Sequence, residues 1–471
     1  MESGSAVYSG VVDLVLEGGL VLTLDEGRRV LEGGAVAIRG GEIVGVGTGS
    51  EILHLRDSAR RVIDCRGKVV LPGMTDGHTH LFQSLGRGLG DGMTLVPWLQ
   101  RFMLPYSKEI TREMSVAAVQ LGALQAALSG TTMVVDNHYA PTDTETILAV
   151  ADAVEEVGIR GAIARGIFGE MNPGGELMGV DPELFVWTNQ QEMAITAECM
   201  AERPSGSQVE VWPCPENIVY VWPEIIEASA ELAEAGGVRW HMHCSEVQDE
   251  IGFFFEVHGQ RPVAWLAEQG LLSNRTTLAH AIWLEPDEVE AMGAQGATAV
   301  HNPISNQYLA SGVLRLEGLL SSGANVALGS DGVAISGQDI FEAMKSGMLM
   351  HRVANLDPTV TTVEQFLELG TRGGAVMTGQ NAGALEVGRQ ADVVVVDIEH
   401  VRHTPLSRPV ASVVHSGNAA EVETVIVGGE IIVEGGRSTR VDEEEVRAKA
   451  AEATSELFGK AHLTELAQAW R

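Results

Sequence analysis

The middle of the chain alternates short apolar runs with longer stretches of helical pattern. Runs such as TTMVVDNHY, IRGAIARG and VEVWPCP are short and continuously apolar, which is typical of strands buried on both faces. Stretches such as SVAAVQLGALQAALSG and IIEASAELAEAGG between them have the composition of helices. Eight such units follow one another over residues 72–381. This order predicts an α/β fold built on a (β/α)8 barrel of the TIM type.

The two ends of the chain have a different pattern. Residues 1–71 contain the strand-like runs VDLVLEGGLVLTL, GAVAIRGGEIVGVG and RVIDCRGKVVL, separated by glycine pairs. Residues 382–440 repeat this texture with ADVVVVDI, ASVVHSG and VETVIVGGEIIVEGG. We expect the two segments to pair into one small β-sandwich, and we expect residues 441–471 to form a helical tail.

Side chains that can do chemistry follow six of the eight predicted barrel strands. The carboxyl ends of barrel strands meet at one face, and this face carries the active site in barrel enzymes. We therefore expect these side chains to lie close together. They are His78 and His80, Asp136 and His138, His243, His280, His301, and Asp331.

Four of these residues suit a metal site. His78 and His80 are two residues apart in LPGMTDGHTH, so their imidazoles point to the same side of an extended strand. His243 offers a third nitrogen, and Asp331 offers an oxygen. Catalytic zinc commonly keeps a coordination position for water, and a divalent cation lowers the pKa of that water toward ~7. The sequence therefore predicts a source of hydroxide at neutral pH.

Hydroxide alone does not expel a poor leaving group such as an amine, because the leaving nitrogen must also be protonated. Glu246 lies three residues past His243, where the strand turns into its loop. We expect Glu246 to act as the proton shuttle, with His280 and Asp331 completing the relay.

Charge and composition narrow the set of partners. The chain has 64 acidic residues against 31 basic ones and a net charge of −33, which argues against nucleic acid and anionic membranes. The four cysteines are widely spaced, which favours free thiols in a reducing compartment. The sequence shows neither a signal-peptide pattern nor an apolar run near the ~20 residues of a membrane helix. We expect a cytoplasmic protein.

The motifs PGMTDGHTH, HMHCSE, LAHAIWL, HNPISNQYLASG and ALGSDG together resemble the amidohydrolase superfamily. They are most similar to its aminohydrolase branch, which contains S-adenosylhomocysteine/methylthioadenosine deaminases, guanine and 8-oxoguanine deaminases, and s-triazine hydrolases such as atrazine chlorohydrolase. The resemblance covers nearly the whole chain. It implies the same barrel with a β-sandwich from both termini. It also implies the metal ligands His78, His80, His243 and Asp331 and the proton-transfer residues Glu246 and His280.

The resemblance also bears on the cofactor. Binuclear relatives carry a carboxylated lysine at the end of the fourth strand, but none of the five lysines lies at VEVWPCP. One divalent ion is therefore expected, zinc in the first place and iron as the alternative, because ligand type alone does not decide between them.

Substrate contacts are suggested by the same resemblance. Relatives contact a heterocycle through the loop after the first strand, where this chain has Gln83 and Trp98. A tryptophan there can stack on a flat ring. Arg165 ends the third strand and can grip a carbonyl, a ring nitrogen or a carboxylate. The remaining candidates at the barrel mouth are His138, His301 and Asn306.

The predicted reaction is hydrolytic deamination of an amino-substituted N-heteroaromatic ring of purine, pterin, pyrimidine or triazine type. Dechlorination or dealkylamination of an s-triazine at the same site is the alternative. The resemblance favours the purine type, because Gly332 follows Asp331 at a position where purine-type deaminases usually have glycine and triazine hydrolases have asparagine or aspartate. Two other hypotheses are ring opening of a cyclic amide, as in imidazolonepropionase-like relatives, and a catalytically silent barrel that serves assembly. The resemblance also implies that the protein is a homo-oligomer. Its expected binding partner is a small heterocyclic substrate.

Overall fold

The computed structural model describes residues 11–48 and 50–467. Strands from both ends of the chain share one sheet, in the order β18-β17-β16-β15-β5-β1-β2-β3, with β4 paired to β1. These strands are β1 (Val12–Leu22), β2 (Val30–Arg39), β3 (Glu42–Thr48), β4 (Ala59–Asp64), β5 (Lys68–Pro72), β15 (Val393–Asp397), β16 (Val422–Val427), β17 (Glu430–Glu434) and β18 (Arg437–Ser438). The antiparallel pair β5–β15 joins the N-terminal half of this terminal sheet to the C-terminal half.

The middle of the chain forms two parallel sheets, with the orders β14-β6-β7-β8-β9 and β10-β11-β12-β13. The first contains β6 (Met74–His80), β7 (Thr131–His138), β8 (Arg160–Ile167), β9 (Val209–Pro215) and β14 (Asp331–Gly332). The second contains β10 (Trp240–Cys244), β11 (Thr276–His280), β12 (Thr298–His301) and β13 (Asn325–Leu328). Parallel strands need crossover connections, and helices supply most of them here.

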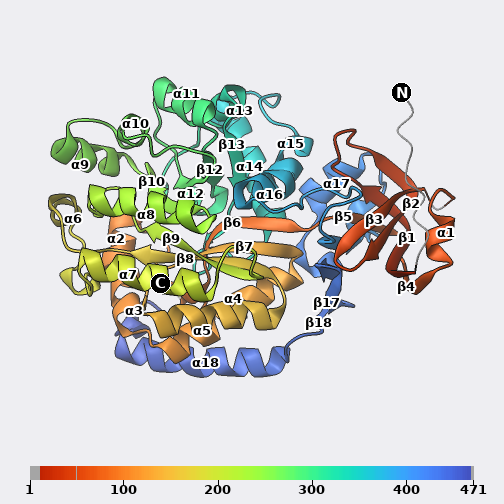
Figure 1. The fold of residues 1–471 in the computed structure, drawn as a ribbon, viewed down its shortest axis with the longest axis horizontal. Helices are drawn as coiled ribbons and strands as arrows, with labels where there is room; N and C mark the ends of the chain where they lie inside the picture. The colour runs from red at the N-terminus through yellow and green to blue at the C-terminus, as the bar shows by residue number, and fades with distance from the viewer. Residues whose placement is uncertain (1–10, 49, 468–471) are drawn as a thin grey trace.

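The helices surround the parallel strands, and the terminal sheet lies at one end of the molecule (Figure 1). The helices that follow the parallel strands β6 to β10 are α2 (Leu95–Trp98), α3 (Leu104–Glu109), α4 (Arg112–Leu128), α5 (Thr144–Val157), α6 (Pro173–Met178), α7 (Asn189–Glu202), α8 (Pro223–Gly236), α9 (Gln248–His258) and α10 (Pro262–Glu268). The others are α1 (Leu53–Arg56), α11 (Pro286–Gln295), α12 (Pro303–Tyr308), α13 (Leu316–Ser322), α14 (Ile340–Asn355), α15 (Val363–Glu368), α16 (Gly374–Thr378), α17 (Pro409–Ser416) and α18 (Glu443–Lys460).

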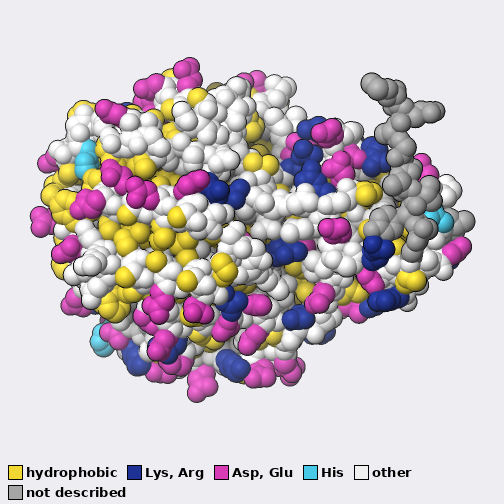
Figure 2. Space-filling view, viewed as in Figure 1, with side chains coloured by type: hydrophobic (Ala, Val, Ile, Leu, Met, Phe, Trp, Pro, Cys, Tyr) yellow, Lys and Arg dark blue, Asp and Glu magenta, His cyan; other side chains and the backbone are white. Residues whose placement is uncertain are grey.

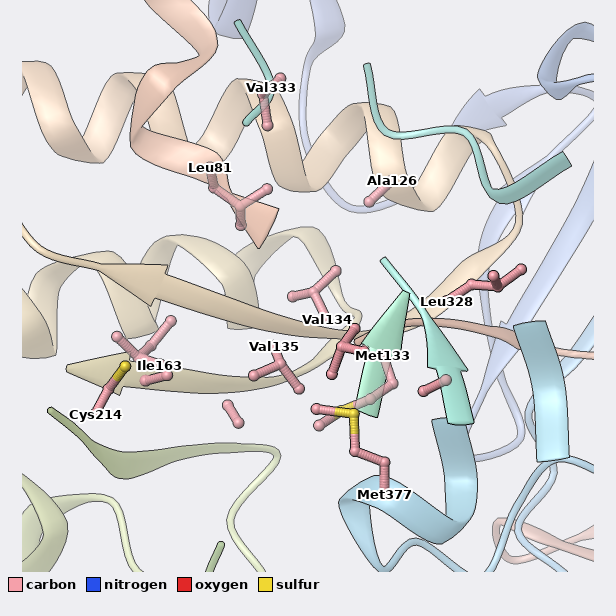
Figure 3. Packing of buried hydrophobic residues seen from close by; sticks show 14 of the residues in the cluster. Leu81, Ala126, Met133, Val134, Val135, Ile163, Cys214, Leu328, Val333 and Met377 are labelled. Carbon is pink, nitrogen blue, oxygen red and sulfur yellow. The ribbon is translucent and has the colours of Figure 1, made fainter. Parts of the chain in front are cut away.

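The parallel strands are buried along their length, which explains their continuous apolar pattern. Every residue of β7 and β9 is buried. Side chains from neighbouring strands, such as Val135, Ile163 and Cys214, pack together in the core (Figure 3). Met377 of α16 lies in the same cluster. The terminal sheet has its own apolar cluster, which includes Leu16 and Val395.

The stretch from Val69 to His78 is divided between two strands. β5 ends at Pro72 in the terminal sheet, and β6 begins at Met74 among the parallel strands. The residue between them is Gly73, where a Cβ atom would lie 2.2 Å from Thr132 Oγ1. Glycine therefore allows the chain to pass between the two sheets at a point where a larger residue would clash.

One expected strand is a helix. ASVVHSG was predicted to be β-rich, but residues Pro409–Ser416 form α17. Pro409 stands at the start of the helix, where its fixed φ angle is favourable and its missing N–H is not needed. Val413 and Val414 are buried, so the short apolar run supplies the buried face of a helix. Short apolar runs do not distinguish strand from helix by periodicity alone.

The C-terminal tail begins as expected. The Asp442 side chain accepts hydrogen bonds from the backbone of Glu444 and Glu445, and acidic residues occupy the first turn of α18, where the helix dipole favours negative charge. α18 ends at Lys460, and residues 468–471 of the predicted tail lie outside the described residues. In the described ranges 11–48 and 50–467, the helices are all too short or too polar to cross a membrane.

Arg165 is buried in the framework instead of facing a substrate. Its side chain is fully buried, and its Nη2 lies 2.7 Å from Glu192 Oε2 on α7. Its Nη1 donates to Thr196 Oγ1 and its Nε donates to the Thr142 carbonyl, each at 2.9 Å. The structure therefore corrects the expected substrate contact: the guanidinium ties β8 to α7, and its donors are already used.

Replacing Arg165 by methionine should test this assignment. The Arg165→Met variant leaves the Glu192 carboxylate buried without its cation, so its free energy of unfolding should fall by about 3–5 kcal/mol in urea denaturation. The double variant Arg165→Met/Glu192→Gln removes both charges and should recover part of the loss. A single variant as stable as the unmodified protein would contradict the structural role.

Candidate active site

Three imidazoles and one carboxylate converge at the carboxyl ends of the parallel strands. His78, His80, His243 and Asp331 each offer one ligand atom, and these atoms lie within 4.8 Å of one another. Asp331 Oδ1 is 3.2 Å from His78 Nε2 and 3.2 Å from His80 Nε2. His243 Nε2 is 3.4 Å from His80 Nε2. The structure thus brings together the four residues expected to bind a metal.

Backbone carbonyls orient two of the imidazoles. His80 Nδ1 is 2.8 Å from the carbonyl of Asn137, and His243 Nδ1 is 2.8 Å from the carbonyl of Glu216. A carbonyl only accepts hydrogen bonds, so Nδ1 carries the proton in both rings. The lone pair of each Nε2 is then free and faces the cluster, which is the arrangement commonly found for histidine ligands of metal ions.

His78 is oriented by a second histidine. His78 Nδ1 is 2.8 Å from His241 Nε2, and His241 Nδ1 is 2.7 Å from Thr277 Oγ1. His78 Nε2 is buried and faces Asp331 Oδ1 at 3.2 Å, and it makes no hydrogen bond outside this cluster of four among the described residues. Buried polar atoms are rarely left without a partner, so this nitrogen fits a metal ligand. The donor set of three imidazoles and one carboxylate fits a divalent transition metal.

A hydrogen-bond network places Asp331 next to the histidines. The buried Asp76 carboxylate on β6 accepts bonds from Ser330 N at 3.0 Å and from Ser330 Oγ at 2.6 Å. Gln338 Nε2 then donates to Ser330 Oγ at 2.7 Å and to Thr79 Oγ1 at 2.6 Å. Asp331 itself has a φ angle of +64°, a left-handed conformation that is unfavourable for most residues. Such strain persists because the surrounding bonds hold it.

The two expected proton-transfer residues lie beside this cluster. His280 Nε2 is 3.6 Å from Glu246 Oε2 and 3.7 Å from Asp331 Oδ2. Ser311 Oγ donates to Glu246 Oε1 at 2.9 Å. His280 Nδ1 is 3.0 Å from Asn306 Oδ1, which can only accept. His280 Nδ1 therefore donates to Asn306, and Nε2 faces the two carboxylates; burial alone would lower the pKa of His280, but the charges of Glu246 and Asp331 outweigh it and raise the pKa. Asn306, expected to contact the substrate, is not among the residues that line the pocket and contacts His280 instead.

The environment sets the protonation of these groups. Burial lowers the pKa of His243 well below its ordinary value, and the neighbouring imidazoles lower it further, so the ring is neutral as a metal ligand must be. Burial alone would raise the pKa of Asp331, but the nearby imidazoles outweigh it and hold the pKa well below its usual range. Burial raises the pKa of Glu246 to about 7, so this carboxyl can both hold and release a proton near neutral pH.

The cluster lies in a pocket that encloses about 840 Å³ of space, including its solvent-open mouth. Gln83 and Trp98 are among the residues that line it. Gln83 Nε2 donates to Tyr139 Oη at 3.1 Å, and Gln83 Oε1 has no hydrogen-bond partner among the described residues. The other hydrophobic side chains on the pocket wall are Leu95, Val96, Leu99, Leu104, Tyr139, Phe168, Met178, Val180, Leu184, Tyr220, Leu309 and Ile335.

His138 and His301 are not among the side chains that line the pocket. His138 pairs with Arg165 in the register of β7 and β8, so both side chains point to the same side of the sheet, toward the helices. The His138 ring packs against Phe82, with ring centroids 5.2 Å apart. His301 Nε2 is 3.1 Å from Nε2 of the buried His351 on α14. The structure therefore corrects both expected substrate contacts, because alternation turns these side chains away.

Glu216 was missed in the sequence. It lines the pocket, is 3% exposed, and follows the end of β9. Its Oε2 accepts from Asn137 Nδ2 at 3.0 Å, and its Oε1 is 3.4 Å from His243 Nδ1. Burial raises the pKa of Glu216 to about 8. The rule that selected the other site residues, a polar side chain just past a barrel strand, would also have selected this glutamate.

Known proteins of similar sequence are deaminases. The 5'-deoxyadenosine deaminase of Methanopyrus kandleri is 31% identical over 449 residues, which cover 94% of this chain and 99% of the relative. The 5-methylthioadenosine/S-adenosylhomocysteine deaminase of Thermococcus sibiricus is 34% identical over 382 residues, which cover 80% of this chain and 86% of the relative.

Solved structures share the fold. An adenosine deaminase from Xanthomonas campestris with bound zinc has a TM-score of 0.88 at 24% identity and covers 96% of this chain and 100% of that chain. Atrazine chlorohydrolase from Arthrobacter aurescens complexed with zinc has a TM-score of 0.86 at 25% identity and covers 94% of this chain and 100% of that chain. Residues 69–432 match the Amidohydrolase family. The chain therefore belongs to the amidohydrolase family.

Proposed function

We propose that this protein is a metal-dependent aminohydrolase that deaminates an amino-substituted N-heteroaromatic ring and releases ammonia. One observation carries the proposal: a three-histidine, one-aspartate cluster lies at the base of a pocket beside Glu246 and His280. The cluster fits a metal that activates water, and Glu246 fits an acid that protonates the ring and so assists the attack. The names of the relatives, all deaminases of adenosine-type compounds, support the same reaction.

We infer a single divalent ion, zinc in the first place, held by His78, His80, His243 and Asp331. When bound, such an ion lowers the pKa of a water molecule and so makes hydroxide available for attack on the ring. The inward lone pairs of the imidazoles support this assignment, as does His78 Nε2, which makes no hydrogen bond outside the cluster among the described residues. Zinc in two structures of the same fold supports the choice of metal, and iron stays the alternative.

The residues beside the cluster would divide the proton transfers. Glu246 holds a proton near neutral pH and donates it to a ring nitrogen, which makes the ring carbon more electrophilic. His280 Nε2 and Asp331 Oδ2 face the same region and orient the attacking water, from which they take a proton. The proton taken from the water then passes to the amino group, which leaves as ammonia, and the remaining hydroxyl proton returns to Glu246 as the product carbonyl forms. Trp98 and Gln83 lie on the wall where a flat ring can be held.

We also propose that the two parallel sheets are the two halves of one (β/α)8 barrel over residues 72–381. β14 follows β13 of the second sheet after Gly329 and Ser330 and pairs with β6 of the first. At the other junction, an isolated parallel bridge joins Asn217, just past β9, to His243 of β10. Residues 1–71 and 382–440 would then form the β-sandwich and residues 441–471 the helical tail. A homo-oligomeric state and a cytoplasmic location stay predictions.

Hydrolysis of an s-triazine is the second candidate function. The likeness to atrazine chlorohydrolase, at a TM-score of 0.86, favours keeping it. The same metal-activated water would displace chloride or an alkylamine instead of ammonia. Product analysis with a chloro- and an amino-substituted triazine separates the two, because one reaction yields halide and the other ammonia.

Removing one ligand should remove the metal. The His243→Ala variant loses an inward imidazole, so its metal content by plasma mass spectrometry should fall from about one ion per chain to well below that value. The exposed His54 provides a matched control, and His54→Ala should keep its metal. Full metal content in His243→Ala would exclude this residue as a ligand.

Neutralising the shuttle should stop turnover without removing the metal. The Glu246→Gln variant keeps the shape of the side chain but cannot transfer a proton, so kcat for ammonia release should fall by ~10²–10⁴-fold. Its metal content should stay unchanged. Glu256→Gln, at an exposed position of α9, is the control and should keep normal turnover. Normal activity in Glu246→Gln would refute the proposed proton shuttle.

A further inference from the structure

The wall between the metal cluster and the pocket mouth is made largely of apolar side chains. Leu95, Val96 and Leu99 from the α2 region line one part of it. Val180 and Leu184, from the segment after α6, line another part. A substituent on the reacting ring that extends toward solvent would therefore contact hydrocarbon.

The apolar character continues onto the surface. Hydrophobic side chains gather on the visible face around α6 and α8 (Figure 2). Leu177 on α6 is 42% exposed, and Val186 is 66% exposed. Large exposed apolar side chains close to a pocket favour the approach of an apolar ligand over a strongly hydrated one.

The charged side chains of the pocket are acidic. Glu216, Glu246 and Asp331 line it, whereas neither lysine nor arginine does so among the described residues. Lys108, near the outer end of this wall, lies 3.1 Å from Asp181 and 2.6 Å from Glu183 and is thus already paired. An anionic group entering this pocket would lose its water without gaining a cationic partner, which is strongly unfavourable.

We propose that the substrate carries an uncharged, apolar substituent on its amino-heterocycle, and that the pocket rejects substrates whose substituent bears a phosphate or an amino-acid group. This inference rests on the proposed deaminase function and narrows it. It separates the compounds in the names of the two relatives: 5'-deoxyadenosine and 5-methylthioadenosine carry uncharged substituents, whereas S-adenosylhomocysteine carries a carboxylate and an ammonium.

Matched pairs of substrates test the proposal. The metal-loaded protein is assayed for ammonia release with 5'-methylthioadenosine against S-adenosylhomocysteine, with adenosine against its 5'-monophosphate, and with an N-alkyl against an N-carboxyalkyl aminotriazine. In each pair that reacts, we expect kcat/KM for the charged member to be at least ~100-fold lower than for the uncharged member. The difference should appear mainly in KM, because the buried anion stays unpaired. Equal kcat/KM values within the reacting pairs would overturn the inference and leave the proposed function standing. If no compound releases ammonia, the proposed function fails, and the inference fails with it.

Two substitutions of Leu184 on the pocket wall separate the effect of a positive charge from the effect of a changed side-chain shape. Leu184→Arg places a guanidinium on the pocket wall, and Leu184→Gln places a polar but uncharged side chain at the same position. The arginine variant should raise kcat/KM for the charged member of a reacting pair by at least ~10-fold relative to the glutamine variant, because the anion gains a partner. The same selectivity in both variants would overturn the electrostatic explanation.

Discussion

The buried carboxylate of Asp76 connects the two strands on which the site depends. It accepts a bond from His78 N at 3.3 Å on its own strand and two bonds from Ser330, the residue before Asp331. Burial raises the pKa of Asp76 to about 7, so three donors are needed to offset its lost hydration. Without this link, the carboxylate ligand and the paired imidazoles would belong to segments some 250 residues apart with little to fix their spacing.

Hydrogen bonds also fix the orientation of the imidazoles around the cluster. Each ligand imidazole uses Nδ1 for a neighbour and keeps Nε2 for the centre, so few rotations of the rings are compatible with the fold. Two residues of the site, His280 and Asp331, have left-handed backbone conformations, with φ angles of 70° and 64°. Strain at such positions is held by the surrounding packing, and it turns side chains at strand ends toward the pocket.

The sequence was sufficient for the residues whose position follows from the strand ends alone. The four residues of the cluster, Glu246 and His280 lie together because the parallel strands bring their carboxyl ends to one face. The sequence was insufficient where the side of a strand matters. His138 ends β7 and Arg165 lies two residues before the end of β8. Both point toward the helices, and a strand that is apolar on both faces does not reveal which side is which. The helix α17 shows the same limit, since only Pro409 distinguished it from a strand.

β5, which leads through Gly73 into β6, depends on a strand that is synthesised much later. β5 has β1 on one edge, but its other edge pairs with β15, and Gly73 N donates to the carbonyl of Asp392 at 2.9 Å. A ribosome releases β5 long before β15, so during most of synthesis the strand next to the histidine ligands has an open edge. Open edges pair readily with other chains. The nascent protein therefore keeps this edge open until residues 393–397 emerge, and β5, which leads directly into β6, is paired on both edges only near the end of translation.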